Sequence, residues 1–161
     1  MSIESVCQYL ARWGRDKDII VMEESTATVA LAAAALGVIP ARIAKSISLR
    51  VEKDGVPAAM VVVTAGDVKL DNRKYKDRFD LKAKMLSPGE ALEYTGHAVG
   101  GVCPFALPPG VEVYLDVSLQ RFQTVYPACG SGNSAIELTM DELKEYSASL
   151  DWVDVCAPIG A

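Results

Sequence analysis

Apolar and polar residues alternate with two different periods along the chain, which predicts a mixture of strands and helices. In residues 45–52 (KSISLRVE) every second residue from position 47 is apolar, the pattern of a strand with one buried face. The Asp-Gly pair at 54–55 predicts a hairpin turn, and the apolar run 58–64 (AAMVVVT) predicts the returning strand. Lys45 shares the parity of the apolar residues, so its ammonium is expected on the interior side of the sheet.

Helical spacing and capping signals predict several helices between these strands. The alanine-rich stretch 25–38 (STATVALAAAALGV) is expected to be capped by Ser25 or Thr26 and ended by Gly37. Further helices are expected after Ser2, at about 71–79, between Ser87 and Gly96 and from Thr139 onward, with a helical turn at 39–44. Further strands are expected at 18–22, near 82–86, and at 111–117, 122–128, 135–139 and 152–155.

The order of these elements indicates the fold class. Strands and helices are interspersed without regular βαβ spacing, which favours an α+β fold with a mixed, partly closed, barrel-like sheet and flanking helices. The chain has 161 residues and no repeats or linkers, so residues 1–161 are expected to form a single domain.

Composition narrows the class of protein. Half of the residues are apolar and 23% are charged, as in a soluble globular protein. No apolar run approaches the roughly 20 residues that span a bilayer, and the N-terminus lacks the pattern of a signal peptide. We therefore expect a cytoplasmic protein without a membrane partner. The four cysteines are far apart without a CxxC pair, and there is one histidine, so we expect no metal and no cofactor.

One stretch departs from the acidic balance of the chain, whose net charge is −5. Residues 67–84 carry seven Lys or Arg against four Asp. The net charge argues against a generic nucleic-acid coat, but two interpretations of this stretch stay open. It is either a solvated helix face or a face on which Arg73, Lys74 and Lys76 contact phosphates.

Two glycine-rich loops are candidates for binding. In residues 96–110 (GHAVGGVCPFALPPG), Gly100 and Gly101 allow positive φ and close approach of another molecule, and prolines stiffen the rest of the stretch. Such a loop can present fixed backbone N–H and C=O groups, or it can be only a turn. Residues 129–133 (CGSGN) offer the same two interpretations, and they are not a P-loop because no Gly-Lys-Ser/Thr comes after them.

Side-chain chemistry offers few alternatives. No GxSxG motif is present and His97 is alone, which argues against a Ser-His-Asp triad. Cys103 and His97 form a conceivable nucleophile pair, although they lie six residues apart across two glycines. Lys45 either reaches a cavity or a partner, or extends along the apolar surface to solvent at the end of its strand.

These elements together resemble one family. The stretches STATVALAAAALGV…ARIAKSI, GDVKLD, TGHAVGGVCPFALPPGVEVYLD and FQTVYPACGSGNSAIELTMDEL are similar to the YbaK and prolyl-tRNA-synthetase editing-domain family, over about residues 20 to 155. The resemblance implies a free-standing aminoacyl-tRNA deacylase, which removes a mischarged amino acid from the 3′ end of a tRNA, most often the tRNA for proline. It implies an ester hydrolysis without metal or covalent nucleophile, assisted by the ribose hydroxyl of the substrate or by a bound water.

The resemblance also assigns residues. It matches the family lysine to Lys45 and the family glycine motif to Gly100, Gly101 and Pro104. The residues expected to line the substrate pocket are Thr26, Ser46, His97, Gly130, Ser131, Gly132 and Asn133. Two positions depart from the members that act on Cys-tRNA: Ala135 stands where they have an aspartate, and Thr28 where they have a tyrosine. Both differences argue against cysteine as the amino acid removed.

The expected partners are implied by the same resemblance. They are the aminoacylated 3′ end of a tRNA and, further, an aminoacyl-tRNA synthetase; the sequence does not predict the oligomeric state. The alternative is a non-catalytic module of the same fold that binds charged tRNA or a regulatory partner. An intact lysine and glycine motif favour the enzyme.

Overall fold

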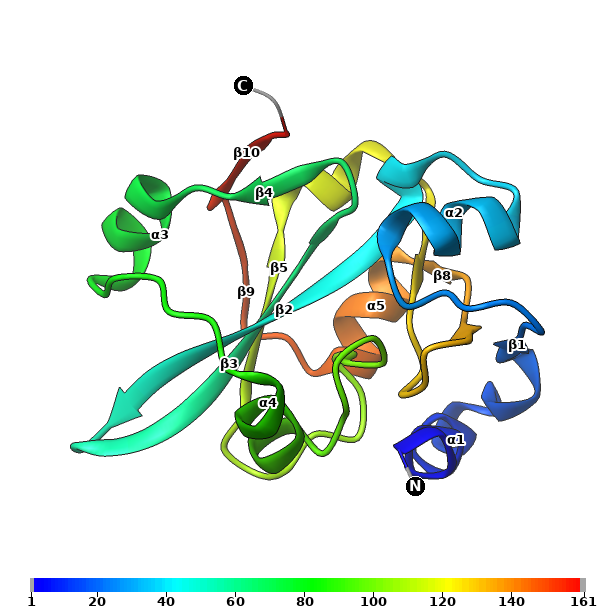
Figure 1. Cartoon of the computed structure of the whole chain (residues 1–161), viewed down its shortest axis with the longest axis horizontal. Coiled ribbons are helices and arrows are strands. Elements are labelled where there is room, and N and C mark those ends of the chain that lie inside the picture. Colours follow the sequence, from blue (N-terminus) through cyan, green and yellow to red (C-terminus); the bar gives the residue numbers. More distant parts are fainter. Residues whose placement is uncertain (1, 160–161) are drawn as a thin grey trace.

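A curled, mixed sheet of six strands forms the centre of the computed structural model, which describes residues 2–159, and helices lie around this sheet (Figure 1). The α-helices are α1 (Ser2–Leu10), α2 (Val29–Leu36), α3 (Asn72–Phe79), α4 (Pro88–Thr95) and α5 (Met140–Ser147). Short 3-10 helices are η1 (Ala11–Trp13), η2 (Asp16–Asp18), η3 (Pro40–Arg42) and η4 (Val117–Arg121). The strands are β1 (Ile20–Val21), β2 (Ile43–Lys53), β3 (Val56–Ala65), β4 (Val68–Leu70), β5 (Glu112–Asp116), β6 (Thr124–Pro127), β7 (Ser134–Ala135), β8 (Leu138–Thr139), β9 (Asp151–Val153) and β10 (Cys156–Pro158).

The long β2–β3 hairpin is the framework of the sheet. The two strands are antiparallel, with Lys45 opposite Thr64 and Leu49 opposite Met60, which confirms the hairpin predicted from the alternating pattern. The strand order is β8-β6-β2-β3-β5-β9, and the β2/β6, β3/β5 and β5/β9 pairs are parallel. Two small sheets, β1/β7 and β4/β10, complete the architecture. The predicted class, an α+β fold with a half-barrel sheet and flanking helices, is confirmed.

The core lies mainly on the β2–β3 hairpin and its parallel neighbours. Val61, Val62 and Val63 of β3 are fully buried, as are Leu49 of β2 and Leu115 of β5. Burial of such side chains stabilises a fold by about 1.5–3 kcal/mol each. Among the helices of residues 2–159, none is both long and apolar enough to cross a membrane.

Two local predictions are wrong in detail. The alanine-rich helix begins two or three residues later than expected, because Thr28 is its N-cap and accepts a hydrogen bond from the Leu31 N–H. Thr26 lies before the helix, in a segment whose backbone is bound to the second glycine-rich loop by the hydrogen bond from the Thr26 N–H to the Gly132 carbonyl. The strand expected near 82–86 is a single bridge between Leu49 and Met85, because the chain turns at once into α4.

Candidate functional site

A cavity of about 510 Å³ opens on the face of β2 that α2 and α4 flank. Its size falls within the range of about 300–1,000 Å³ typical of small-molecule sites. The strand β2, the start of α2, the segment before α4 and the loop after His97 supply most of its wall. Its lining residues are Thr26, Ala27, Thr28, Val29, Ala32, Ile43, Ala44, Lys45, Ser46, Ser48, Met85, Leu86, Pro88, Val99, Gly100, Val102, Tyr126, Ala128, Ser134 and Ala135.

Lys45 is the only charged side chain among these described lining residues. The ammonium Nζ donates a hydrogen bond to the Val68 carbonyl, at the start of β4. Burial lowers the pKa of Lys45, because desolvation disfavours its charged form, and the nearby Cys156 and Asp67 oppose this shift. Lys45 thus lines the cavity as a residue, while its half-buried side chain ends in a hydrogen bond to the backbone of β4.

Two hydroxyl groups in the cavity wall lack partners. The Oγ1 atom of Thr26 and the Oγ atom of Ser46 are buried, and neither makes a hydrogen bond with any described residue. Thr26 as a whole is only 7% exposed. A buried hydroxyl without a partner costs about 1–3 kcal/mol, and such exceptions in a folded protein call for an explanation. Both residues line the cavity, so a molecule bound there is a candidate partner for their hydroxyls.

The two glycines of the first loop have different positions. Gly100 lines the cavity at φ +95°, a conformation that favours glycine, and a Cβ there would lie 3.1 Å from the Ala27 Cβ. Gly101 does not line the cavity; a Cβ at this position would lie 2.8 Å from backbone atoms of Gly130 and Ser131. The close approach that Gly101 permits is thus between the two glycine-rich loops, and not with the ligand as expected. Its N–H also donates to the Ala98 carbonyl at 2.9 Å, whereas the Gly100 N–H has no acceptor among residues 2–159.

The second glycine-rich loop, residues 129–133 (the late loop), lies outside the cavity wall and supports it. Gly130, Ser131, Gly132 and Asn133 do not line the cavity, although Ser134 and Ala135 next to them do. The Gly132 carbonyl accepts from the Thr26 N–H at 2.6 Å, and the Asn133 Nδ2 donates to the Met22 carbonyl at 3.0 Å. The loop therefore fixes the segment that carries Thr26 to the cavity.

His97 and Cys103 lie beneath the first loop, contrary to the expectation that His97 lines the pocket. His97 is 1% exposed, and its Nε2 is 2.7 Å from the Phe105 carbonyl. Since a carbonyl only accepts, Nε2 carries the proton and Nδ1 accepts from the Ser2 hydroxyl. Cys103 is fully buried and burial raises the pKa of its thiol to about 12. This thiol is not an activated nucleophile, and Pro104 beside it is also buried away from the cavity.

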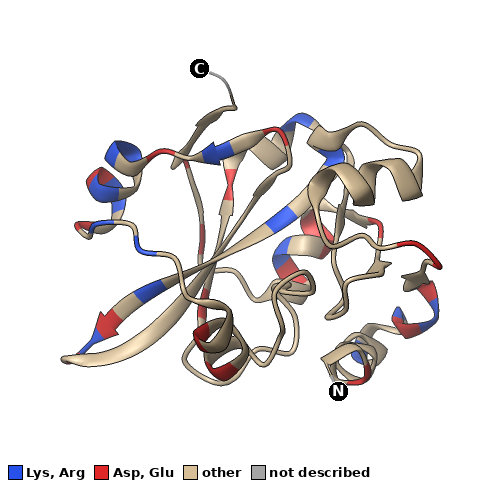
Figure 2. Cartoon of the chain, viewed as in Figure 1, with Lys and Arg blue, Asp and Glu red and all other residues tan. Residues whose placement is uncertain are grey.

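The basic stretch 67–84 contains α3, and some of its cations form ion pairs while others do not. Lys74 Nζ lies 3.1 Å from Asp154 and donates to the Cys156 carbonyl at 2.9 Å, so it ties α3 to the C-terminal strands. Arg73 and Lys76 are exposed and make no ion pair with any described residue. Figure 2 shows Lys and Arg concentrated on β4, α3 and the coil after it.

Several residues that line the cavity were not predicted from the sequence. Val99 and Met85 are 64% and 60% exposed at the cavity, unusual for large apolar side chains. Tyr126 and Ser48 also line it, from β6 and β2. The valine lies directly before the expected glycine motif, but the methionine carries no sequence signal because only the tertiary fold brings it beside β2.

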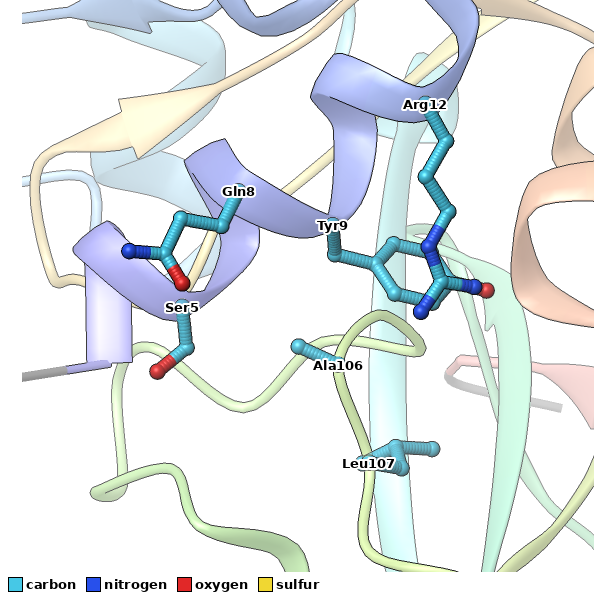
Figure 3. A pocket seen from close by; sticks show the side chains of 6 residues that line it. All are labelled: Ser5, Gln8, Tyr9, Arg12, Ala106 and Leu107. Atoms are coloured by element: carbon cyan, nitrogen blue, oxygen red, sulfur yellow. The ribbon is translucent and has the colours of Figure 1, made fainter.

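A second, smaller cavity of about 290 Å³ lies between α1, η1 and residues 106–107 (Figure 3). Its lining residues are Ser5, Gln8, Tyr9, Arg12, Ala106 and Leu107. Tyr9 donates its hydroxyl proton to the Tyr146 carbonyl, and the Arg12 guanidinium lies over the Tyr9 ring at 4.7 Å. These groups already have partners, so the larger cavity is the better candidate site. Within residues 2–159, no three His, Cys, Asp or Glu side chains gather as a metal-binding group.

Comparison with known proteins identifies relatives of this chain. Residues 23–146 match the family model of the "Aminoacyl-tRNA editing domain". A protein of Bacillus subtilis (strain 168), "Uncharacterized protein YwhH", is 56% identical over 156 residues, which cover 97% of this chain and 98% of that protein.

Solved structures agree with the family match. A crystal structure described as "a putative trans-editing enzyme for prolyl tRNA synthetase" superposes with a TM-score of 0.84 at 27% identity, covering 97% of both chains. The crystal structure of "hypothetical protein APE2540" superposes with a TM-score of 0.78 at 30% identity, covering 92% of this chain and 99% of that one.

Proposed function

This chain belongs to the aminoacyl-tRNA editing domain family, and from that premise we propose that it is a free-standing aminoacyl-tRNA deacylase. The substrate is a mischarged tRNA, and we propose the tRNA for proline, in line with the described role of one structural neighbour. The observation that supports catalysis best is the cavity itself. It combines a single charged group, Lys45, with two buried hydroxyls that have no partner.

The reaction is the hydrolysis of the ester between the amino acid and the terminal ribose. Water oxygen bonds to the carbonyl carbon, the bond from that carbon to the ribose oxygen breaks, and the ribose oxygen takes up a proton. The transition state carries a developing negative charge on the carbonyl oxygen, which must be stabilised. A preorganised donor aimed at that oxygen lowers the barrier by about 3 kcal/mol.

Two groups of the chain suit that task. The Lys45 ammonium supplies positive charge at the cavity, and the Gly100 N–H is a backbone donor with no acceptor among residues 2–159. The Gly101 N–H is excluded from this role because it already donates to Ala98. The hydroxyls of Thr26 and Ser46 hold the ammonium of the amino acid or the hydroxyls of the ribose.

The lining supports a mechanism without a covalent intermediate on the protein. No carboxylate, imidazole or thiol lines the cavity among its described residues, and the Lys45 ammonium donates its hydrogen bond to the Val68 carbonyl, so no side chain is paired with Thr26 or Ser46 as a base. We propose that the ribose hydroxyl next to the ester, or a bound water, moves the proton.

The amino acid removed is proposed to be small and not cysteine. Thr28 and Ala135, the two positions that depart from the members acting on Cys-tRNA, both line the cavity. A threonine and an alanine at these positions would give the bound amino acid different contacts from a tyrosine and an aspartate.

A panel of tRNAs for proline, each charged with a different labelled amino acid, tests this proposal. We expect release of at least one small amino acid well above the spontaneous rate, and no loss of proline. If every ester survives as in buffer while charged tRNA binds, the chain is a binding module of the same fold and the deacylase proposal fails.

A further inference from the structure

A second functional surface lies beside the cavity, on the stretch from Lys69 to Lys84, which we call the basic segment. It comprises the end of β4, all of α3 and the coil after it, and it carries seven Lys or Arg against three Asp. The whole chain has a net charge of −5, so this concentration runs against the charge of the molecule. Figure 2 shows the basic residues following one another along this part of the ribbon.

Two of the seven cations have structural roles. Lys74 pairs with Asp154 at 3.1 Å, and Arg78 pairs with Asp151 at 3.3 Å. The Arg78 guanidinium also lies 4.9 Å from the centroid of the Phe79 ring. These contacts hold α3 against the C-terminal part of the chain. They leave little of either charge for a partner.

The other five cations are available. They are Lys69, Arg73, Lys76, Lys82 and Lys84, all exposed and without an ion pair to any described residue. Exposed, unpaired cations in sequence are the usual footprint of a polyanion-binding surface.

The basic segment adjoins the cavity directly at its C-terminal end and is linked to it through Lys45 at its N-terminal end. Before its first residue, the Val68 carbonyl accepts the hydrogen bond of the Lys45 ammonium. After its last residue, Met85 and Leu86 line the cavity, where the Leu86 N–H donates to the Ser48 carbonyl at 3.2 Å. A molecule whose end occupies the cavity can therefore extend past Met85 toward Lys84, Lys82 and the rest of the basic segment.

We infer that the basic segment contacts the phosphate backbone of the tRNA acceptor arm while the aminoacylated end occupies the cavity. This inference rests on the proposed function, which makes the occupant of the cavity the 3′ end of a tRNA. Backbone contacts of this kind supply affinity that depends on salt and carry no sequence information. The set of contacting residues omits Lys74 and includes Lys69, Lys82 and Lys84 beside Arg73 and Lys76.

Binding of deacylated bulk tRNA between about 50 and about 200 mM salt tests the inference. The variant carries Arg73→Gln, Lys76→Gln and Lys82→Gln; the control carries Arg12→Gln, Lys17→Gln and Lys144→Gln, an equal loss of charge on exposed residues elsewhere. We expect the variant to lower the salt slope of log Kd by about three, roughly one for each lost contact, and the affinity about tenfold or more. Lys76→Gln alone should give about a third of the slope change, and the control should match the wild type.

The inference is overturned if the wild type does not bind tRNA, or if variant and control change binding equally. Hydrolysis of a short aminoacylated CCA end, which has no stem, separates this result from the deacylase proposal. Both triple variants should cleave it at the wild-type rate. If no protein cleaves it while the salt slope still falls in the variant alone, the surface stands and the deacylase proposal fails.

Discussion

At the scale of single residues, the cavity is distinguished by groups that the fold leaves unsatisfied. The hydroxyls of Thr26 and Ser46 are buried without partners, while the buried Thr95 hydroxyl donates to Ala91 at 2.6 Å and accepts from the His97 N–H at 3.1 Å. Since an unpaired hydroxyl contributes nothing to folding, the explanation that we propose for it is a contact with the ligand.

Replacing Thr26 by valine tests this explanation, because valine has nearly the same shape without the hydroxyl. We expect the free energy of unfolding to stay constant or to rise by about 1 kcal/mol, and kcat/KM for deacylation to fall about tenfold. The matched change Thr95→Val should instead lower the free energy of unfolding by about 1–3 kcal/mol, because it leaves the buried His97 N–H without an acceptor. Thermal melts and deacylation rates of both variants provide the comparison. A Thr26→Val protein with unchanged kinetics would remove the hydroxyl from the binding site.

The buried imidazole of His97 should make the stability of the fold depend on pH. Burial lowers the pKa of its imidazole, against a weaker opposing effect of the Phe105 carbonyl. Below about pH 6.5 the unfolded chain takes up the proton before the folded protein does. Stability is therefore complete above that pH and is lost as the pH falls toward the lower folded pKa. An NMR titration of the single histidine, with melts between about pH 7.5 and 5.5, measures both effects. A folded-state pKa at or above 6.5 would contradict the burial of this ring.

At the scale of elements, the two glycine-rich loops act as one unit. A side chain at Gly101 would meet the backbone of Gly130 and Ser131 at 2.8 Å, and the late loop in turn holds Thr26 through the Gly132 carbonyl. The first loop thus lines the cavity directly through Gly100 and also positions Thr26 indirectly, by fixing the second loop.

Gly101→Ala should accordingly separate the loops, cost about 1–3 kcal/mol of stability and slow deacylation. Gly89→Ala is the control, since a Cβ there meets nothing within 4 Å in the first turn of α4. That variant should gain about 0.5–1 kcal/mol and keep its activity. Chemical denaturation of both proteins measures the difference. Equal effects of the two substitutions would show that the loops do not depend on their contact.

Most elements could be predicted from the sequence because their signals are local. The capping boxes at Ser87 and Thr139 form as expected, and the alternation after Lys45 forms β2. The failures have tertiary causes. The start of α2 lies at Thr28, one of three neighbouring hydroxyl residues that could cap it, while residue 26 is held by a loop more than a hundred residues away; the strand near 82–86 is cut short by α4.

In the whole molecule, the site depends on tertiary contacts that the periodic pattern of apolar residues does not predict. The sequence pointed to Lys45 and Gly100, which do line the cavity, but His97 and the late loop support the wall from outside. The lining residues come from segments that the half-barrel brings together, from Thr26 to Ala135. Parity along one strand could suggest that Lys45 faces inward, but not that the Val68 carbonyl would accept its hydrogen bond.

Single-turnover deacylation of a mischarged tRNA for proline by the wild type and by Lys45→Met is the decisive test of the proposed mechanism. The methionine keeps an unbranched apolar stem without the ammonium. If the cavity hydrolyses the ester with the help of this charge, the wild type should deacylate well above the spontaneous rate. The variant should lose about a hundredfold, close to the roughly 3 kcal/mol expected of one oxyanion-stabilising group, while its melting temperature stays within a few degrees. A Lys45→Met protein that melts normally and deacylates at the wild-type rate would contradict the account.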